Sequence, residues 1–160
     1  MAQSRYDKMR AIMAHSYTAN HLHIVFSTLE RRKLISEGMR PALWAYMAGV
    51  GRKHDLIMHL VGGYQDHAHA LISLPATVTL AEAIQTIKAV SSKWMHRQGV
   101  SAFQWQEGYG AFSVSESNMN RVRAYIRSQE QHHRKATFED EFRGLLRRHG
   151  IAFDERYVWG

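Results

Sequence analysis

Strand-like and helix-like residue patterns alternate along this chain in an order that few folds accommodate. An apolar period of two residues indicates a strand, and a period of three to four indicates an amphipathic helix. Strand patterns cover residues 17–28, 56–63, 67–74, 103–106 and 110–115, and helix patterns cover approximately 36–54, 79–98, 118–135 and 138–149. The order is βαββαβ followed by further helices, which is the split βαβ order of ferredoxin-like and RRM-like folds. We therefore predict an α+β fold whose antiparallel sheet carries both crossover helices on one face and leaves the other face free.

Individual residues support the ends of these elements. Pro41 is tolerated in the first turn of its helix, Thr79 can cap the next helix, and Gly150 can stop the last one. The chain has 160 residues with no internal repeat and no linker-like segment. We therefore predict one domain that spans residues 1–160.

Composition excludes several classes of protein. Hydrophobic residues make up 45% of the chain and charged residues 22%, which excludes a disordered or low-complexity protein. No apolar run approaches the roughly 18 residues that span a bilayer, and the first residues lack a secretory signal, so we expect a cytoplasmic protein with no membrane partner. The absence of cysteine excludes thiolate catalysis and cysteine-based zinc sites, but 11 histidines keep a metal site open.

Basic side chains outnumber acidic ones. Lys and Arg number 21 against 14 Asp and Glu, which gives a net charge of +7 and an isoelectric point near 9.9. Such a balance is typical of proteins that bind nucleic acids, although the same charge also keeps an ordinary domain in solution. Charge therefore favours a nucleic-acid partner only modestly, and the choice between these two interpretations depends on the motifs.

Two histidines open the strand pattern at 67–74. Because strand side chains alternate, His67 and His69 point to one face, while the apolar residues between and after them turn to the helix-covered side. Two neutral imidazoles on one face can hold a divalent cation if a third ligand is nearby. The alternative is a pair of surface histidines.

Three other histidines fall in strand patterns. His21 and His23 repeat the same spacing on the first strand, and His59 lies on a neighbouring one. No acidic residue or turn stands beside His21 and His23, so we expect them to be polar residues on the open sheet face. All three rank below His67 and His69 as ligands.

The helix pattern at 118–135 carries a second group of polar residues. Its apolar stripe consists of Met119, Val122, Ile126 and His133. Tyr125 lies beside that stripe, with Gln129 one turn later on the same face, Arg121 one turn earlier and His132 about two turns later. A phenol, an amide oxygen and a guanidinium can thus converge. The alternative is a half-buried tyrosine that packs on the sheet.

Together these motifs resemble the single-tyrosine HUH transposases of the insertion-sequence-200-like type, relatives of the REP-associated tyrosine transposases. The resemblance covers nearly the whole chain and is carried by HIVFSTLERRKLI (23–35), DHAHALISLP (66–75), KWMHRQG (93–99), FQWQEGYGAFSVSES (103–117), YIRSQEQHHRKATFEDEF (125–142) and HGIAFDERYVW (149–159). It implies that His67 and His69 are metal ligands, that Gln129 is the third ligand, and that Tyr125, on the C-terminal helices, is the nucleophile.

The resemblance also implies a function. The protein would be a DNA transposase, a homodimer that recognises hairpin ends and cleaves and rejoins single-stranded DNA through a 5′-phosphotyrosine link, assisted by Mg²⁺ or Mn²⁺. The chemistry is consistent, because a phenol with a pKa of about 10 needs a nearby cation to act as a nucleophile at neutral pH. The phosphotyrosine also conserves the energy of the broken link, so that a 3′-OH can reseal it without ATP.

Basic side chains are candidates for holding the DNA backbone, although many of them simply solvate helix faces. The candidates are Arg31, Arg32, Lys33, Arg52, Lys53, Lys88, Lys93, Arg121, Arg123 and Arg127. Trp105, Tyr109 and Phe112 are candidate platforms for base stacking, although Trp105 and Phe112 are individually more typical of a core.

Three other functions stay open. An RRM-like module would bind nucleic acid without catalysis. A metal-dependent phosphodiesterase would hydrolyse DNA through water, with Tyr125 only packing. A domesticated relative would keep the transposase chemistry but act on host repeats.

Overall fold

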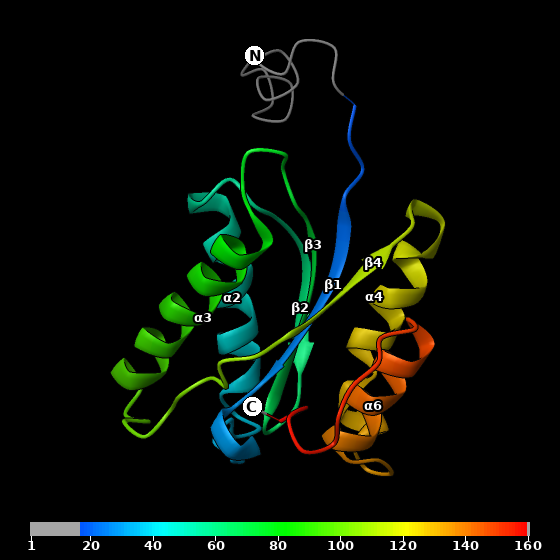
Figure 1. The fold of residues 1–160 in the computed structure, drawn as a ribbon. Coiled ribbons are helices and arrows are strands. Elements are labelled where there is room, and N and C mark those ends of the chain that lie inside the picture. The colour runs from blue at the N-terminus through cyan, green and yellow to red at the C-terminus, as the bar shows by residue number, and fades with distance from the viewer. Residues whose placement is uncertain (1–16, 160) are drawn as a thin grey trace.

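The computed structural model describes residues 17–159. The predicted domain spans 1–160, so residues 1–16 and 160 of that range lie outside the described part. The described chain forms a four-stranded sheet with helices packed on both faces (Figure 1). Within it, no helix is both long and apolar enough to cross a lipid bilayer.

The sheet is antiparallel throughout, as the sequence predicts. Its strands are β1 (His21–Ser27), β2 (Ile57–Gly63), β3 (His67–Ser73) and β4 (Gly110–Val114). Their spatial order is β2-β3-β1-β4, so β3 and β1 are the central strands. For a βαββαβ chain this is the ferredoxin-like arrangement. In the β1–β3 register, Val25 pairs with His69 and Ser27 pairs with His67.

The crossover helices α2 (Arg40–Lys53) and α3 (Leu80–Arg97) lie together on one face of the sheet, as predicted. The Thr79 side chain caps α3 by accepting from the Glu82 backbone N–H, and the Glu82 carboxylate accepts from the Thr79 N–H in return. α2 begins at Arg40, four residues after the predicted start, because Pro41 lacks an N–H and so suits the first turn. Apolar side chains of β1 and β3 form the core against these helices, among them Ile24, Phe26, Ala68, Ala70 and Ile72.

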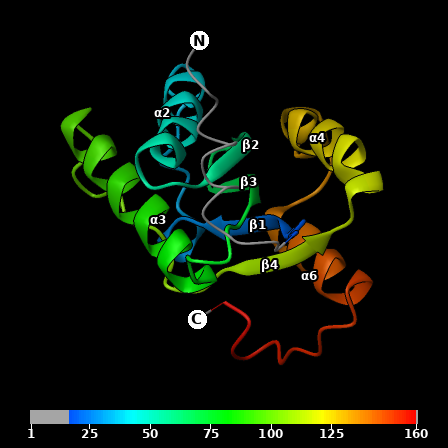
Figure 2. The ribbon, with the colours of Figure 1, turned by 90° about the horizontal axis from the view of Figure 1, so that it is seen from above.

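The opposite face is covered by C-terminal helices, so the prediction that it is free was wrong. α4 (Met119–Arg127), α5 (Gln129–His132) and α6 (Phe138–Arg148) lie across it (Figure 2). Two apolar clusters attach them: Leu71 and Val114 with Met119 and Ile126 beneath α4, and Val25 and Phe112 with Phe138, Phe142 and Leu145 beneath α6. The strand and helix patterns did not predict this packing, because they do not indicate which surface of the sheet the C-terminal helices contact.

Two local elements also differ from the sequence prediction. The single helix predicted at 118–135 follows a 3-10 turn (Glu116–Asn118) and is divided at Ser128, whose hydroxyl donates to the Tyr125 carbonyl. The strand predicted at 103–106 is reduced to one bridge, between Trp105 and Thr28. A second 3-10 turn (Leu29–Arg31) follows β1 and ends the regular pairing there.

Two strand glycines allow the C-terminal helices to approach the sheet closely. A Cβ atom added to Gly62 would lie 2.7 Å from Cγ2 of Ile126 and 3.0 Å from its backbone oxygen. A Cβ atom added to Gly110 would lie 2.7 Å from Cε2 of Phe142. The sheet face is therefore shaped to receive α4 at β2 and α6 at β4.

Candidate metal and tyrosine site

The two histidines of β3 lie at the centre of the covered sheet face. His67 and His69 are both 0% exposed, and the alanines that alternate with them face the core beneath α2 and α3. Nδ1 of His67 lies 2.7 Å from Oδ1 of Asp66, which holds the ring with Nε2 directed toward α5. The shared face predicted for the two imidazoles is therefore the buried side toward the C-terminal helices.

The structure brings the other two predicted site residues to the same place. Gln129 is buried at the start of α5, and its Oε1 lies 2.9 Å from Nε2 of His67. Tyr125, half-buried on α4, has its ring edge-on to His69 with 5.8 Å between ring centroids. Arg121, which was expected to converge with them, is exposed on α4 instead.

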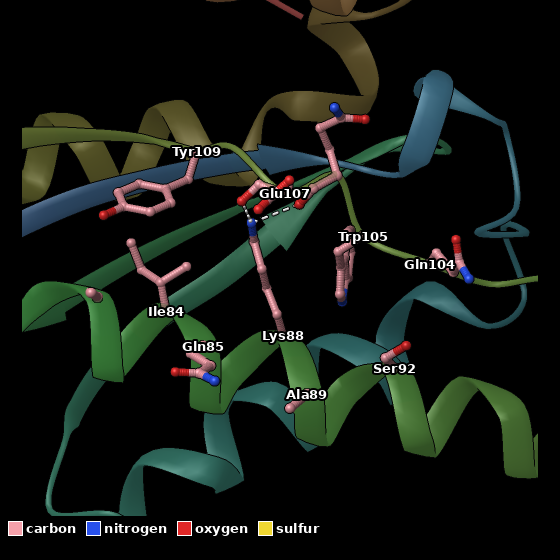
Figure 3. Close-up of a pocket in the computed structure, with 11 residues that line it drawn as sticks. Ile84, Gln85, Lys88, Ala89, Ser92, Gln104, Trp105, Glu107 and Tyr109 are labelled. Atoms are coloured by element: carbon pink, nitrogen blue, oxygen red, sulfur yellow. Dashed lines mark hydrogen bonds between the residues drawn. The ribbon is translucent and has the colours of Figure 1, made fainter. Parts of the chain in front are cut away.

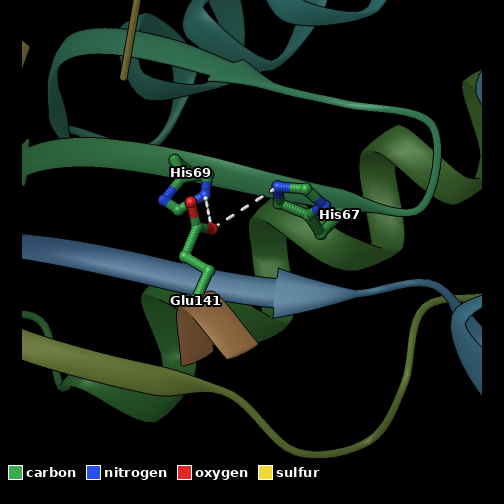
Figure 4. A group of neighbouring side chains, drawn as sticks. All are labelled: His67, His69 and Glu141. Carbon is green, nitrogen blue, oxygen red and sulfur yellow. Dashed lines mark hydrogen bonds and ion pairs between the residues drawn. The ribbon is translucent and has the colours of Figure 1, made fainter. Parts of the chain in front are cut away.

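A carboxylate that the sequence reasoning missed connects all four residues. Glu141 of α6 is buried, with Oε1 2.9 Å from Nε2 of His69 and 3.6 Å from Nε2 of His67 (Figure 4). Its Oε2 accepts from the Tyr125 hydroxyl at 2.7 Å and from Nε2 of Gln129 at 3.0 Å. A signal was present, since Glu141 falls on the apolar stripe of α6, and a charged residue there needs a buried partner.

Three further histidines surround the carboxylate and its neighbours. His132 and His133 place their Nε2 atoms 3.1 Å and 3.2 Å from Oε2 of Glu141. Nε2 of His23 lies 2.8 Å from Nδ1 of His69. The expectation that His23 is a polar residue on an open sheet face was wrong, because α6 buries that end of the face.

The remaining strand histidines lie apart from Glu141. His21 and His59 both approach Oγ of Ser73 at 2.6 Å, and His21 also lies 2.7 Å from the exposed carboxylate of Glu116. Arg123 of α4 reaches His59 at 3.2 Å. These residues form a separate polar contact between the sheet and the start of α4.

The imidazole hydrogen bonds determine which ring nitrogens face the centre of the cluster. Nδ1 of His67 faces the Asp66 carboxylate, and Nδ1 of His133 lies 2.9 Å from the carbonyl oxygen of Ala136. Both partners only accept, so in the neutral rings Nδ1 carries the proton and Nε2 keeps a lone pair. Each Nε2 nevertheless lies 2.9 Å from Oε1 of Gln129, which is also an acceptor.

With neutral imidazoles, lone pairs therefore face lone pairs at the centre of the cluster. Turning the Gln129 amide by 180° only moves the conflict, because its oxygen would then face Oε2 of Glu141. A positive charge placed among these atoms removes the conflict. Imidazole nitrogens, an amide oxygen and a carboxylate form a mixed donor set of the kind that binds divalent metals. The residues present thus fit a divalent cation.

The pKa values of the cluster reflect burial and the charge of Glu141. The Glu141 carboxylate outweighs burial and raises the pKa of His133 above its usual value. Burial raises the pKa of the Tyr125 phenol above its usual value, and the Glu141 charge raises it further. Burial alone would also raise the pKa of Glu141, but contacts with His133 and His69 hold it well below its usual range. Burial lowers the pKa of His69 and of His23. Without added positive charge, the cluster keeps a protonated phenol beside a charged carboxylate.

Most of the basic residues expected to hold DNA are exposed: Arg32, Lys33, Arg52, Lys53, Lys93, Arg121 and Arg127. Arg31 and Arg123 contact the protein itself, through Glu139 at 2.7 Å and His59 respectively. Arg148 of α6, which the sequence reasoning did not select, acts electrostatically on the Tyr125 phenol.

Lys88 lies in a groove of about 440 Å³ between α3 and the segment 104–109 (Figure 3). Its ammonium group donates to the carbonyl oxygens of Gln106, Glu107 and Gly108. Burial lowers its pKa to about 8. Tyr109 lines the same groove and is 41% exposed. Lys88 therefore anchors a loop of its own chain, and Tyr109 is the exposed member of the predicted stacking platforms.

The other two predicted platforms belong to the core. Trp105 makes edge contacts with Phe26 and Phe103, and its indole N–H donates to Ser91. Phe112 is buried and stacks on His149. Phe112 therefore offers no face to a base, whereas Trp105 is partly buried and lines the groove beside Lys88.

Comparisons with known proteins indicate one family. The sequence model of the family described as "Transposase IS200 like" matches residues 16–129. No curated protein matches the chain. A crystal structure from Deinococcus radiodurans R1, provisionally described as a transposase, has a TM-score of 0.58 at 15% identity, covering 81% of this chain and 98% of its own. A REP-associated tyrosine transposase bound to a REP hairpin has a TM-score of 0.50 at 15% identity, covering 81% of this chain and 70% of its own.

Proposed function

Because this chain belongs to the family of IS200-like transposases, we propose that it cleaves and rejoins single-stranded DNA through a covalent link to Tyr125. The observation that carries the proposal is the contact through Glu141. One oxygen of this carboxylate accepts from the Tyr125 hydroxyl and the other lies 2.9 Å from His69. A nucleophile and the ligands that act on the same phosphate have to lie this close together.

We further propose that His67, His69 and Gln129 hold Mg²⁺ or Mn²⁺, with Glu141 as an additional ligand. The support is the conflict between lone pairs that a cation removes and the carboxylate oxygen beside both histidines. When bound, such a cation would withdraw negative charge from the scissile phosphate. The imidazole nitrogens favour Mn²⁺ over Mg²⁺ in this set.

Tyr125 would perform the first step. Its phenol oxygen attacks the scissile phosphorus, and the bond from phosphorus to the 3′-oxygen breaks. Glu141 Oε2, 2.7 Å from the phenol oxygen, would take the phenol proton while a bound cation lowers the phenol pKa, and would pass that proton to the departing 3′-oxygen, which becomes a 3′-OH. The 5′-phosphate stays bonded to Tyr125. In the second step, the oxygen of a 3′-OH bonds to the phosphorus, the bond from phosphorus to the Tyr125 oxygen breaks, and the proton of the 3′-OH passes to Tyr125.

The proposed substrate is single-stranded DNA that carries hairpins. The family and the net charge of +7 support a DNA partner, and the REP-associated neighbour is bound to a hairpin. Arg121 and Arg127 lie exposed on the same helix as Tyr125, where they can contact the phosphates that flank the cleaved bond.

A homodimer is proposed on the resemblance alone. The Tyr125 ring lies beside His69 of the same chain, and Gln129 contacts His67. The resemblance also allows the tyrosine helix of one chain to serve the histidines of its partner. Sedimentation equilibrium of the full chain, with and without DNA, tests the dimer.

The alternative functions differ in what they require. An RRM-like module stacks bases on an open sheet face, whereas α4 and α6 cover this one and leave His67 and His69 0% exposed. A hydrolysing phosphodiesterase would cleave DNA without any covalent adduct. A domesticated relative would keep the adduct, and hairpins in the DNA that flanks its gene would distinguish it from a mobile element.

The test uses single-stranded oligonucleotides from the protein's own locus with Mn²⁺, followed by a denaturing gel. The wild-type chain should form a protein–DNA adduct and release a strand with a free 3′-OH. Tyr125→Phe should form no adduct, because it lacks the attacking oxygen. The matched control is Tyr46→Phe, a tyrosine of α2 on the opposite face of the sheet, which should keep the adduct. Cleavage without an adduct in all three proteins would support the hydrolase instead.

A further inference from the structure

The carboxylate of Glu141 has two oxygens with different surroundings. Oε1 faces the strand histidines, His69 at 2.9 Å and His67 at 3.6 Å. Oε2 faces the helix histidines, His132 at 3.1 Å and His133 at 3.2 Å. Oε2 also accepts from the Tyr125 hydroxyl and from Nε2 of Gln129. The site thus has two halves that share the Glu141 carboxylate and the amide oxygen of Gln129, which lies 2.9 Å from both His67 and His133.

The Oε2 half contains a ligand group of its own. Nε2 of His132, Nε2 of His133 and an oxygen of Glu141 all lie within 4.8 Å of one another, which is close enough for one metal ion to contact all three. His132 and His133 are consecutive residues at the end of α5, where the chain turns toward α6. Neither the strand histidines nor the oxygen of Gln129 is needed to complete this group.

Nε2 of His132 is a buried atom without a hydrogen-bond partner among the described residues. It lies 3.1 Å from Glu141 Oε2, but not in a direction that makes a hydrogen bond. A buried nitrogen left in this way carries an uncompensated desolvation cost, which a bound cation would remove.

His133 is held in the orientation of a ligand. In the neutral ring its Nδ1 proton is directed to the Ala136 carbonyl, which leaves the Nε2 lone pair between Gln129 Oε1 at 2.9 Å and Glu141 Oε2 at 3.2 Å. A metal-bound histidine commonly donates the proton of its other ring nitrogen to a backbone carbonyl in this way. The competing account is that His133 carries a second proton and donates it to Glu141, without any metal.

From these observations we propose that His132, His133 and Glu141 Oε2 hold a second divalent cation beside the one assigned to His67, His69 and Gln129, with the Glu141 carboxylate bridging the two. The proposal rests on the proposed function for its first cation. Two imidazoles and one carboxylate oxygen favour Mn²⁺ or Zn²⁺ over Mg²⁺. The Tyr125 hydroxyl lies 2.7 Å from the same oxygen, so this cation would be adjacent to the nucleophile. All three ligands lie beyond residues 16–129, the segment that the family model matches.

The experiment counts metal ions on the full chain. Metal-free protein is titrated with Mn²⁺ alone, free metal is removed by gel filtration, and bound manganese is measured by mass spectrometry. We expect two ions per chain in the wild type and one in His132→Gln/His133→Gln. The matched control is His54→Gln, an exposed residue at the end of α2, which should keep two ions. Two carboxylate-bridged Mn²⁺ ions should also give a spin-coupled electron paramagnetic resonance spectrum, which the double variant should lose.

One ion per wild-type chain, or two ions in the double variant, would overturn the proposal. Circular dichroism of the metal-free variants checks that they fold, and the single change His132→Gln, at a partly exposed residue, serves if the double variant does not. In His132→Gln we expect the second ion to bind at least tenfold more weakly. The outcome is separable from that of the proposed function. Two ions without a Tyr125 adduct would contradict only the transposition chemistry, and one ion with an adduct would contradict only the second cation.

Discussion

Replacing Gly62 by alanine tests whether α4 holds Tyr125 against the sheet. The added Cβ would lie 2.7 Å from Cγ2 of Ile126 and 3.0 Å from the backbone oxygen of the same residue. The side chain of Ile126 can rotate away, but its backbone oxygen can move only with α4. Such overpacking typically costs about 1–3 kcal/mol, which is a roughly 5- to 150-fold rise in the unfolded fraction.

Urea unfolding followed by tryptophan fluorescence measures this change in the free energy of unfolding. The matched control is Gly144→Ala in α6, where the nearest atom to the new Cβ is the end of the Arg148 side chain at 4.0 Å. Removing a glycine from a helix interior should stabilise the protein by roughly 0.5–1 kcal/mol. Because α4 carries Tyr125, Gly62→Ala should also reduce adduct formation. An unfolding free energy within about 0.5 kcal/mol of the wild type, with an unchanged adduct yield, would refute the docking of α4 on β2.

Three further predictions concern the buried histidines and the cap of α3. His23→Ala removes the partner of His69 Nδ1, so we expect Mn²⁺ affinity to fall roughly 10- to 100-fold in titration calorimetry, and equal affinity would contradict a supporting role for His23. In metal-free protein burial lowers the pKa values of His23, His59 and His69, whereas Glu141 raises that of His133. Because the lowered groups outnumber the raised one, the unfolded chain should bind more protons below about pH 6.5, and the free energy of unfolding should decrease as the pH is lowered. Thermal unfolding at pH 7.5 and 5.5 checks this, and a higher melting temperature at pH 5.5 than at pH 7.5 would contradict the prediction. Thr79→Ala should cost about 1 kcal/mol in urea unfolding through loss of the α3 cap, without changing Mn²⁺ binding.

Local patterns were sufficient to predict the sheet and its first layer of helices. The two-residue period of residues 67–74 placed His67 and His69 on one face and the alanines on the other, because strand geometry fixes that alternation. The helical spacing of Tyr125 and Gln129 placed both side chains on one face for the same reason. These properties depend on neighbours a few residues away, which the sequence displays directly.

The missed features depend on contacts between distant segments. Glu141 reads as one acid among several in FEDEF, and its role appears only once α6 is placed over β3. His23 was ranked low as a ligand because only its neighbours along the chain were considered, whereas its partner His69 is 46 residues away in the sequence. The strand predicted at 103–106 failed similarly, since its alternation reflects burial of Phe103 and Trp105 against α3 and β1 and not extended pairing.

The separation between His69 and Glu141 along the chain also has a consequence for protein synthesis. The two residues are 72 positions apart, and β3 is translated before α6. At about 5–20 residues per second, roughly 4–14 s pass between their additions to the nascent chain. During that interval the strand histidines exist without the carboxylate that joins them to Tyr125. A polypeptide still growing on the ribosome, or one released early by a stop codon before Glu141, therefore lacks the contact that unites the two halves of the site.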